Sequence, residues 1–253
     1  MSKVIIEKNG PVKTVWMNRP EKKNALDSEL LSNMIDALQA PVAADDRVIV
    51  IRGKGTVFCA GLDMAERSKT AGAGKASGIE IMLRAIELCP LPVVAVVHGD
   101  AIAGGNELAL HCDIVVASQT ARFGMSLAQV GLAPNWFLAK KLMEVLGPVT
   151  TREMLLLGDP LPATKLHALG LIARCVPADQ LEAEAAKVIG RLANNAPLSL
   201  KAMKALTVRQ LEIRDHIKHD DVDALVVAAM QSQDAQEGMK ARLEKRTAKF
   251  QGK

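Results

Sequence analysis

The sequence predicts an α/β protein in which a mostly parallel sheet is followed by a helical region. Strand-like runs alternate with helix-length segments through the first half of the 253-residue chain, and helical spacing dominates after about residue 137. Strand, helix and strand in succession indicate βαβ units, which pair their strands in parallel. This length suits one main domain with an appendage. We place these at residues 1–195 and 196–253.

The first elements are expected to be a hairpin and a helix. VIIEK at residues 4–8 and VKTVWMN at 12–18 flank Asn9-Gly10, a dipeptide favoured in two-residue hairpin turns. Asp27 stands where a helix N-cap belongs. The apolar residues that follow recur at the spacing of one helix face: Leu30, Leu31, Met34, Ile35 and Leu38.

Three later runs are typical of strands that are buried on both faces. VIVIRG at 48–53, PVVAVV at 92–97 and DIVVAS at 113–118 are rich in β-branched residues and show no polar alternation. Such continuous runs are expected where helices cover both sides of a sheet. Between them we expect helices over 79–88 and 104–111.

The last part of the chain is expected to be helical over 197–210, 220–230 and from 234 to the C-terminus. These segments have apolar faces but little to pack on within themselves. They therefore predict a layer that closes over the sheet domain or joins a neighbouring subunit.

Composition argues against several classes of function. The net charge of +4 comes from scattered Lys and Arg without interleaved aromatics, so no nucleic-acid partner is expected. The four cysteines are widely spaced without a zinc-site pattern, so we expect free thiols and no metal. The N-terminus lacks a signal-peptide pattern and no apolar run is long enough to span a bilayer. We therefore expect a cytoplasmic protein with no membrane partner and, since tyrosine is absent, no phenol as proton donor.

Two glycine-containing turns each follow a predicted strand, FCAGLDM at 58–64 and HGDAIAGGNELAL at 98–110. Glycine lets main-chain N–H groups approach a ligand closely, and a helix that starts after the second turn presents its free N–H groups and positive dipole end. That pattern suits an oxyanion. An isolated glycine pair, however, is more often an ordinary strand-to-helix turn.

Five motifs occur in order along essentially the whole chain: MNRPEKKNAL, FCAGLDM, PVVAVVHGDAIAGGNELALHCDIVVAS, ARFGMSLAQVGLAP and EGMKARLEKRTAKF. In identity, order and spacing this set resembles the crotonase, or enoyl-CoA hydratase/isomerase, superfamily. The resemblance implies a spiral of ββα units over residues 1–195. It also implies a helical trimerisation region over 196–253, with trimers often paired into hexamers. One departure is Arg242, where many relatives have an aromatic residue, which leaves the role of the tail in CoA binding open.

The resemblance implies an enzyme that binds an acyl-CoA thioester and stabilises its enolate oxygen with two backbone N–H groups. Residue by residue, these are the N–H groups of Leu62 and Gly104. Enolisation places negative charge on the thioester oxygen, and one well-placed donor contributes about 3 to 4 kcal/mol to the transition state. Coenzyme A is then part of the substrate, and no separate cofactor is expected.

The resemblance also implies where coenzyme A binds. Lys22 or Lys23 could reach its phosphates, although each is equally well explained as a solvated side chain. Main-chain groups around Ala60, Asp63 and Met64 are expected near the adenine.

Glu107 is the carboxylate of the AGGNELAL segment. Its small and apolar neighbours predict burial and a pKa raised toward the range useful in proton transfer. A glutamate in the first turn of a helix is also favoured by the helix dipole alone. Hydratases of the family carry one of their two catalytic glutamates here, so the resemblance makes Glu107 the main acid/base residue.

The second glutamate of those hydratases is replaced. Counting from Phe123 along the motif puts Leu127 at its place, and leucine neither holds a water nor moves a proton. Isomerases of the family commonly place their single base there too. Asn135 stands where some relatives have an aspartate, and an amide can orient a substrate but cannot act as a base.

Two functions stay open at this point. One is hydration, or another enolate-dependent step such as isomerisation, decarboxylation or thioester hydrolysis, with Glu107 as acid/base. The alternative is a CoA-thioester-binding paralogue with little or no hydratase activity because of Leu127. Glu107 beside both glycine turns favours the enzyme. We expect structural roles for His98 and His111. Trp136 and Phe137 are candidates for the acyl pocket, although aromatics this scarce are more often part of the core.

Overall fold

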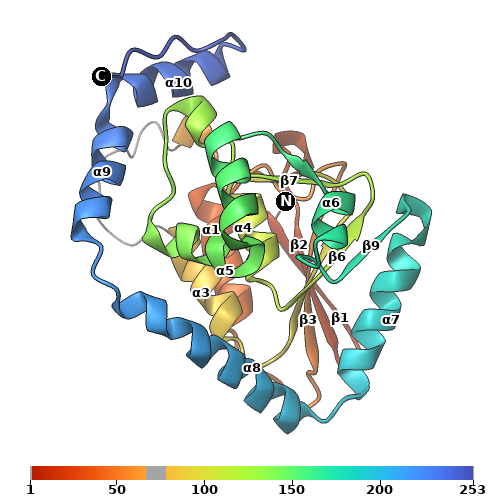
Figure 1. Ribbon diagram of the computed structural model, residues 1–253. Coiled ribbons are helices and arrows are strands. Elements are labelled where there is room, and N and C mark those ends of the chain that lie inside the picture. The colour runs from red at the N-terminus through yellow and green to blue at the C-terminus, as the bar shows by residue number, and fades with distance from the viewer. Residues whose placement is uncertain (1, 67–77, 253) are drawn as a thin grey trace.

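The computed structural model describes residues 2–66 and 78–252 and confirms the α/β class. A six-stranded sheet has the order β1-β2-β3-β4-β6-β9 (Figure 1). Strand β1 (Val4–Asn9) runs antiparallel to β2 (Val12–Met17), which confirms the hairpin. The two turn residues are Gly10 and Pro11 rather than the predicted Asn9 and Gly10, because Asn9 still pairs with Val12. The other neighbouring pairs of this sheet are parallel. Their further strands are β3 (Val48–Gly53), β4 (Val93–Val97), β6 (Ile114–Ser118) and β9 (Arg174–Val176).

Helices cover both faces of this sheet. Ile49 and Ile51 of β3 enter one apolar core, whereas Val48 and Val50 enter the other. Because side chains alternate along a strand, a strand covered on both faces is apolar at every position, which explains the runs without polar alternation. Helix α7 (Leu181–Asn194) packs on one face. The opposite face is covered by α1 (Ser28–Gln39), α3 (Gly78–Leu88) and α4 (Gly104–His111).

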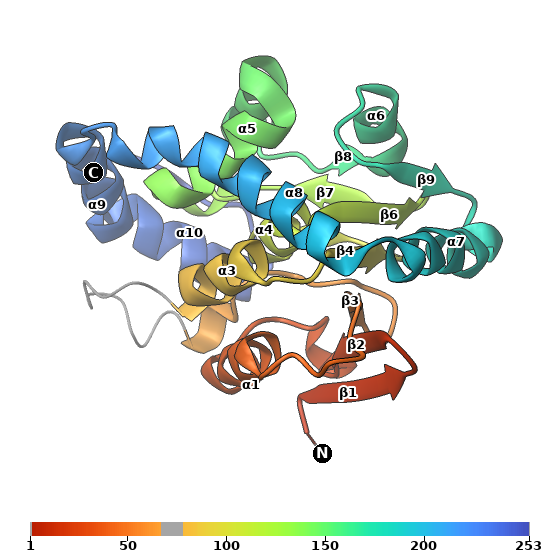
Figure 2. The same cartoon turned by 90° about the horizontal axis from the view of Figure 1, so that it is seen from below.

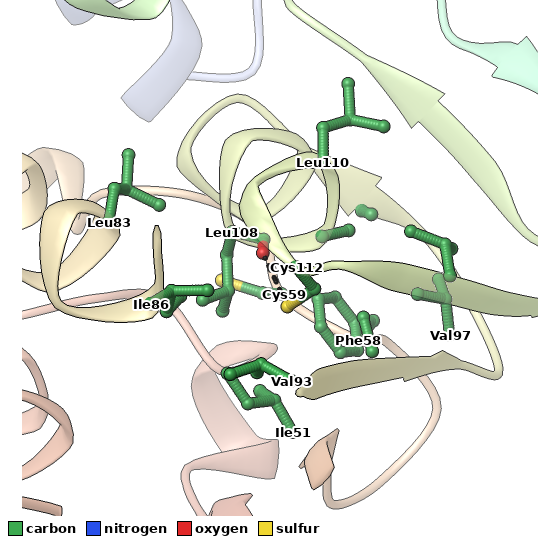
Figure 3. Close-up of a cluster of buried hydrophobic side chains, with 14 of the residues drawn as sticks. Ile51, Phe58, Cys59, Leu83, Ile86, Val93, Val97, Leu108, Leu110 and Cys112 are labelled. Atoms are coloured by element: carbon green, nitrogen blue, oxygen red, sulfur yellow. Dashed lines mark hydrogen bonds between the residues drawn. The ribbon is translucent and has the colours of Figure 1, made fainter. Parts of the chain in front are cut away.

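The larger core surrounds α4 and fixes the helix that carries Glu107. Figure 3 shows Leu108 among side chains of α3, β3 and β4, with Phe58 below the helix. The predicted free thiols are confirmed, and three of the four are buried. Cys112 donates to the carbonyl of Leu108 at 3.2 Å, and burial raises the pKa of the Cys59 thiol to about 12. These thiols are therefore packing groups rather than nucleophiles.

A second, three-stranded sheet consists of β5 (Ala101–Ile102), β7 (Arg122–Gly124) and β8 (Leu161–Pro162). Helices dominate after about residue 137, as the sequence predicts, but the short strands β8 and β9 also lie in that part. Each has only two or three residues. β8 is a strand because it pairs with β7, and β9 because it pairs with β6. No local sequence pattern reveals this pairing.

The second half is otherwise helical. Helix α10 covers Gln233–Leu243, so the expectation of a helix from residue 234 to the C-terminus is wrong. Arg246 turns back to bind Glu237 with two nitrogens, and the carboxylate of Asp234 accepts from two tail N–H groups. Besides α7, the helices here are α5 (Trp136–Arg152), α6 (Ala163–Ala168), α8 (Pro197–Leu211), α9 (Asp220–Gln231) and α10.

Helices α8 to α10 form an arm that runs along one side of the molecule (Figures 1 and 2). Several large apolar side chains on this arm are exposed, including Leu198, Leu206, Ile213 and Leu225. Within residues 2–66 and 78–252, no helix is both long enough and apolar enough to cross a membrane.

Candidate active site

The two glycine turns, far apart in the sequence, lie against each other. Cys59 and Ala101 form an isolated parallel bridge, in which the N–H of Ile102 donates to the Cys59 carbonyl at 2.9 Å. A Cβ atom at Gly61, whose φ is +88°, would lie 3.0 Å from the nitrogen of Gly104. The structure therefore brings the turn that contains Leu62 to the start of α4. Gly104, which the resemblance makes the second donor, is the first residue of that helix.

The N–H groups of Leu62 and Gly104 donate to no other group in the described part of the chain. Gly104 is the first residue of α4, so its N–H has no partner within the helix, and the positive end of the helix dipole lies there. The turn beside it is fixed, because Leu26 donates to the carbonyl of Gly61 at 2.8 Å and accepts from the N–H of Asp63 at 3.0 Å. Two neighbouring unpaired donors on a fixed backbone suit an oxyanion.

The residue before Gly104 is strained. Ala103 has φ +50° and ψ −116°, a conformation that costs a non-glycine residue about 1 to 3 kcal/mol. Its N–H donates to the carbonyl of Gly124 at 2.7 Å, which holds it in place. The next glycine serves packing, because a Cβ atom at Gly105 would lie 2.1 Å from the carbonyl oxygen of Cys59. The glycine pair thus combines a donor position with a close helix-to-loop contact.

Glu107 is fully buried on α4, and neither of its carboxyl oxygens has a hydrogen-bond partner. Burial raises the pKa of this carboxyl well above its usual range; the positive charge of Lys141 opposes the shift, and the negative charge of Glu87 adds to it. Both the burial and the direction of the shift are as the neighbouring sequence predicts. A buried carboxyl of this kind favours its protonated form and is suited to donate a proton.

His111 lies one turn further along α4. Its Nδ1 is 2.8 Å from the carbonyl oxygen of Glu107 and 3.6 Å from Oε2 of the same residue. Burial lowers the pKa of the His111 ring far below its usual range. The ring also packs 5.3 Å from that of Phe137. The contact with Glu107 was not predicted from the sequence, although residues spaced by four on one helix lie on the same face.

Two buried lysines of α5 also lie near this site, and they were not predicted from the sequence. Lys141 Nζ lies 2.5 Å from Oε1 of Glu87 and 3.5 Å from Oε2 of Glu144. Lys140 pairs with Asp215 at 2.5 Å. Lysine is rarely buried unless it is paired, and partners on distant elements cannot be read from the sequence of α5.

Leu127 and Asn135 differ in their surroundings. Leu127 is half-buried against the main core and against a small apolar cluster that includes Ala235. Asn135 caps α5, because its Oδ1 accepts from the N–H of Leu138 at 3.1 Å and its Nδ2 donates to Glu80 at 2.7 Å. Both ends of this amide are therefore engaged in the fold, and a substrate contact by Asn135 stays a prediction.

The two aromatics that follow Asn135 do not share one environment. Trp136 donates from Nε1 to the carbonyl of Arg214 at 3.3 Å and stacks on the ring of His219 at 4.5 Å. It therefore joins α5 to the segment after α8. Phe137 lies beside His111.

The loop expected to hold coenzyme A is fastened to the first glycine turn. Lys22 and Lys23 are exposed on this loop, and Arg19 Nη1 lies 2.7 Å from Oδ2 of Asp63. The N–H of Ala60 donates to the carbonyl of Lys23 at 3.0 Å. That N–H and the N–H of Asp63 are thus engaged within the chain. Met64, the next residue, is half-buried, and contacts of this segment with adenine stay a prediction.

A large cavity of about 710 Å³ lies elsewhere, between the C-terminal end of α1 and helix α3. Leu38, Val42, Ile81 and Leu88 line it, with Phe137. Neither glycine turn contributes to its wall, and neither does Glu107. Among the described residues, no group of three His, Cys, Asp or Glu side chains could hold a metal ion.

Comparisons with known proteins show which proteins this chain is similar to. Residues 7–253 match the family model described as "Enoyl-CoA hydratase/isomerase". The chain is 31% identical to a 2,3-dehydroadipyl-CoA hydratase of Escherichia coli, with all of both chains covered. It is 34% identical to a probable enoyl-CoA hydratase of Mycobacterium leprae, covering 95% of this chain and 96% of that one.

Solved structures show the same likeness. An enoyl-CoA hydratase from Mycobacterium avium subsp. paratuberculosis superposes with a TM-score of 0.85 at 31% identity, covering 98% of each chain. A methylmalonyl-CoA decarboxylase in complex with 2S-carboxypropyl-CoA superposes with a TM-score of 0.93 at 25% identity, covering 100% of this chain and 99% of that one.

Proposed function

Because the chain belongs to the enoyl-CoA hydratase/isomerase family, we propose that this acyl-CoA-binding enzyme hydrates an enoyl-CoA with Glu107 as its acid. The N–H groups of Leu62 and Gly104 hold the thioester oxygen. One observation carries the proposal: two neighbouring backbone N–H groups without partners lie at the start of the helix whose buried carboxyl also has no partner.

Each group has one task in the reaction. The oxygen of a water molecule bonds to the β-carbon of the enoyl thioester, and the π electrons move onto the thioester oxygen. The two N–H groups stabilise the resulting negative charge, each by about 3 to 4 kcal/mol. Protonated Glu107 then gives its proton to the α-carbon, and the proton lost by the water restores the acid. The chain, the thioester and water supply every atom of these steps.

The lack of a second carboxylate sets the expected rate. Leu127 cannot orient or deprotonate the attacking water, and one acid–base group typically contributes about 10² to 10⁴-fold. We therefore expect hydration to be slow rather than absent. Leu127→Glu tests this point, because a carboxylate there should raise the rate of crotonyl-CoA hydration if the pocket accepts it.

Decarboxylation of a malonyl-type CoA thioester is the second candidate. The likeness to the methylmalonyl-CoA decarboxylase supports it, and so does the inventory of groups. When CO₂ leaves, the electrons of the broken C–C bond form the enolate directly, so the reaction needs an oxyanion hole and one acid but no base. The two N–H groups and Glu107 supply that set, and Leu127 adds no second carboxylate that would repel the substrate.

A single comparison separates the possibilities. Purified protein is mixed with crotonyl-CoA, and loss of the enoyl-thioester absorbance is followed; a parallel sample with methylmalonyl-CoA is assayed for CO₂. Loss of absorbance supports hydration, and CO₂ release supports decarboxylation. If neither occurs while CoA thioesters still stabilise the protein, the chain binds thioesters with little or no catalysis. Ligand at 100 times its Kd should add about 2.7 kcal/mol to the free energy of unfolding.

A further inference from the structure

Asn24 carries a fully buried amide in the loop between β2 and α1. Its Oδ1 accepts from the N–H of Arg19 at 3.0 Å. An amide also offers two N–H groups as donors, and here they share three main-chain carbonyls. These carbonyls lie 2.8 to 3.1 Å from Nδ2 and belong to Lys54, Val57 and Phe58. The side chain therefore ties its own loop to the segment that follows β3.

The fold leaves space for this amide. Gly53 is the last residue of β3, and a Cβ atom there would lie 2.7 Å from Asn24 Nδ2. Asn24 itself has φ +54°, in the left-handed region that asparagine adopts more readily than most other residues with a side chain. Both residue types are therefore explained by the tight junction between this loop and the end of β3.

The loop that Asn24 fixes also holds the first glycine turn. The carbonyl of Lys23 accepts from the N–H of Ala60 at 3.0 Å. Leu26 pairs with Leu62 in an isolated parallel bridge, whose hydrogen bonds are made by the residues directly before and after Leu62. Leu62 is therefore held on both sides, while its own N–H donates to no other group in the described part of the chain.

One hydrogen bond of this bridge sets the direction of the Leu62 N–H. The Gly61 carbonyl, which accepts from Leu26 at 2.8 Å, and the Leu62 N–H belong to the same peptide group. The atoms of a trans peptide group lie in one plane, so its C=O and N–H bonds point in opposite directions. Fixing the Gly61 carbonyl against Leu26 therefore also fixes the line along which the Leu62 N–H points.

We propose that Asn24 is a positioning residue, whose buried amide keeps the Leu62 N–H directed at the oxygen of the bound thioester. The proposal rests on the function proposed above. Asn24 anchors the loop, and Leu26 in that loop orients the peptide that carries the N–H. Without the anchor, this donor should shift relative to the N–H of Gly104. A displacement of about 1 Å at such a site can lower the rate about 10²-fold.

Two uncharged variants test the role of the amide. Asn24→Gly and Asn24→Ala both remove it without changing the charge of the protein. Glycine adopts a positive φ without strain, so the glycine variant should be the more stable of the two. If the alanine variant does not fold, the glycine variant still carries the test.

The readout is the ionisation of bound acetoacetyl-CoA, which needs no turnover. The carbon between its ketone and its thioester loses a proton to solvent, and the enolate that forms is followed by its ultraviolet absorbance. Two well-placed N–H donors should lower the pH midpoint of this step relative to the free ligand. Each variant should raise the midpoint again by about 1 to 2 pH, which corresponds to about a 10- to 10²-fold weaker preference for the enolate. Binding of butyryl-CoA, which stays un-ionised, should change little.

Asn18→Ala is the matched control, because it removes one amide contact, from Nδ2 to the carbonyl of Ser2 at 3.0 Å, outside this junction. It should keep the wild-type midpoint. The midpoint is measured on bound ligand, so it does not depend on the fraction of protein that is folded. A variant of Asn24 that keeps the wild-type midpoint would overturn the positioning role even if its Tm fell, since a purely structural role gives that result. If wild type itself leaves the midpoint at the value of the free ligand, the two donors bind no oxyanion, and the proposed function fails together with this inference.

Discussion

Arg19 Nη1 lies 2.7 Å from Oδ2 of Asp63 and joins the loop that carries the exposed lysines to the first glycine turn. Both side chains are mostly buried. Asp63→Asn should loosen that junction and raise KM for CoA thioesters more than it lowers kcat, because the contacts affected are binding contacts. Steady-state kinetics check this, with Asp45→Asn, which removes an exposed carboxylate paired with Lys8, as the control. A fall in kcat at unchanged KM would contradict it.

The same pair should stabilise the fold above about pH 4 and lose that contribution in acid. Hydrogen bonding from Arg19 lowers the pKa of Asp63, while partial burial opposes the shift. A carboxyl whose folded pKa lies below its unfolded value stabilises the protein above that unfolded value, about 4, and the contribution is lost as pH falls through the folded pKa. The Tm difference between wild type and Asp63→Asn should therefore shrink below about pH 4. A difference that stays constant from neutral pH into acid would refute this linkage.

Lys204 fastens the C-terminal arm to the sheet domain. Its Nζ donates to Asp113 Oδ2 at 2.7 Å and to the carbonyls of Ile86 and Leu91 at 2.9 and 3.1 Å. Lys204→Met leaves these acceptors without their cation and should cost about 3 kcal/mol, near the low end for a broken buried pair, because the Asp113 side chain keeps 29% exposure. Chemical denaturation measures this. Lys201→Met, on the exposed face of the same helix, should lower the free energy of unfolding only slightly. An equal loss in both variants would contradict the role given to Lys204.

The arm should be covered by another subunit. Leu198, Leu206, Ile213 and Leu225 expose large apolar side chains along it, and burying such surface between copies is favourable by about 25 cal/mol per Å². We therefore expect a trimer or a pair of trimers, as the sequence resemblance implies. Light scattering at micromolar concentration gives the mass directly, and Leu225→Lys should weaken the assembly. A wild-type monomer would exclude this expectation.

Much of the fold is predictable because its signals are local. The strands that begin at Val48 and Ile114 show buried β-branched runs, and Asp27 caps α1 by accepting from Leu30 as its position predicts. Strands β8 and β9 are not predictable, since pairing with distant strands creates them. The end of α10 escaped for a similar reason, because the return of the tail depends on Arg246 reaching back to Glu237.

The site likewise contains features that the sequence predicts and features that it does not. Leu62 and Gly104 were identified from motifs, and the structure brings their turns together. The raised pKa of Glu107 followed from its apolar neighbours. The surroundings of that carboxyl could not be predicted from the sequence. Lys141 has the pattern of an ordinary lysine of an amphipathic helix, and only the structure shows that Glu87, from another helix, lies 2.5 Å away.

The most direct test of the central claim is the initial rate of crotonyl-CoA hydration by wild type and Glu107→Gln at matched saturation. The amide is nearly isosteric but cannot give a proton, so CoA-thioester binding should persist while the rate falls by about 10² to 10⁴-fold. Thermal stabilisation by the thioester, measured on both proteins, confirms that binding is kept. A variant that binds the thioester and hydrates it at the wild-type rate would show that Glu107 is not the acid of this enzyme.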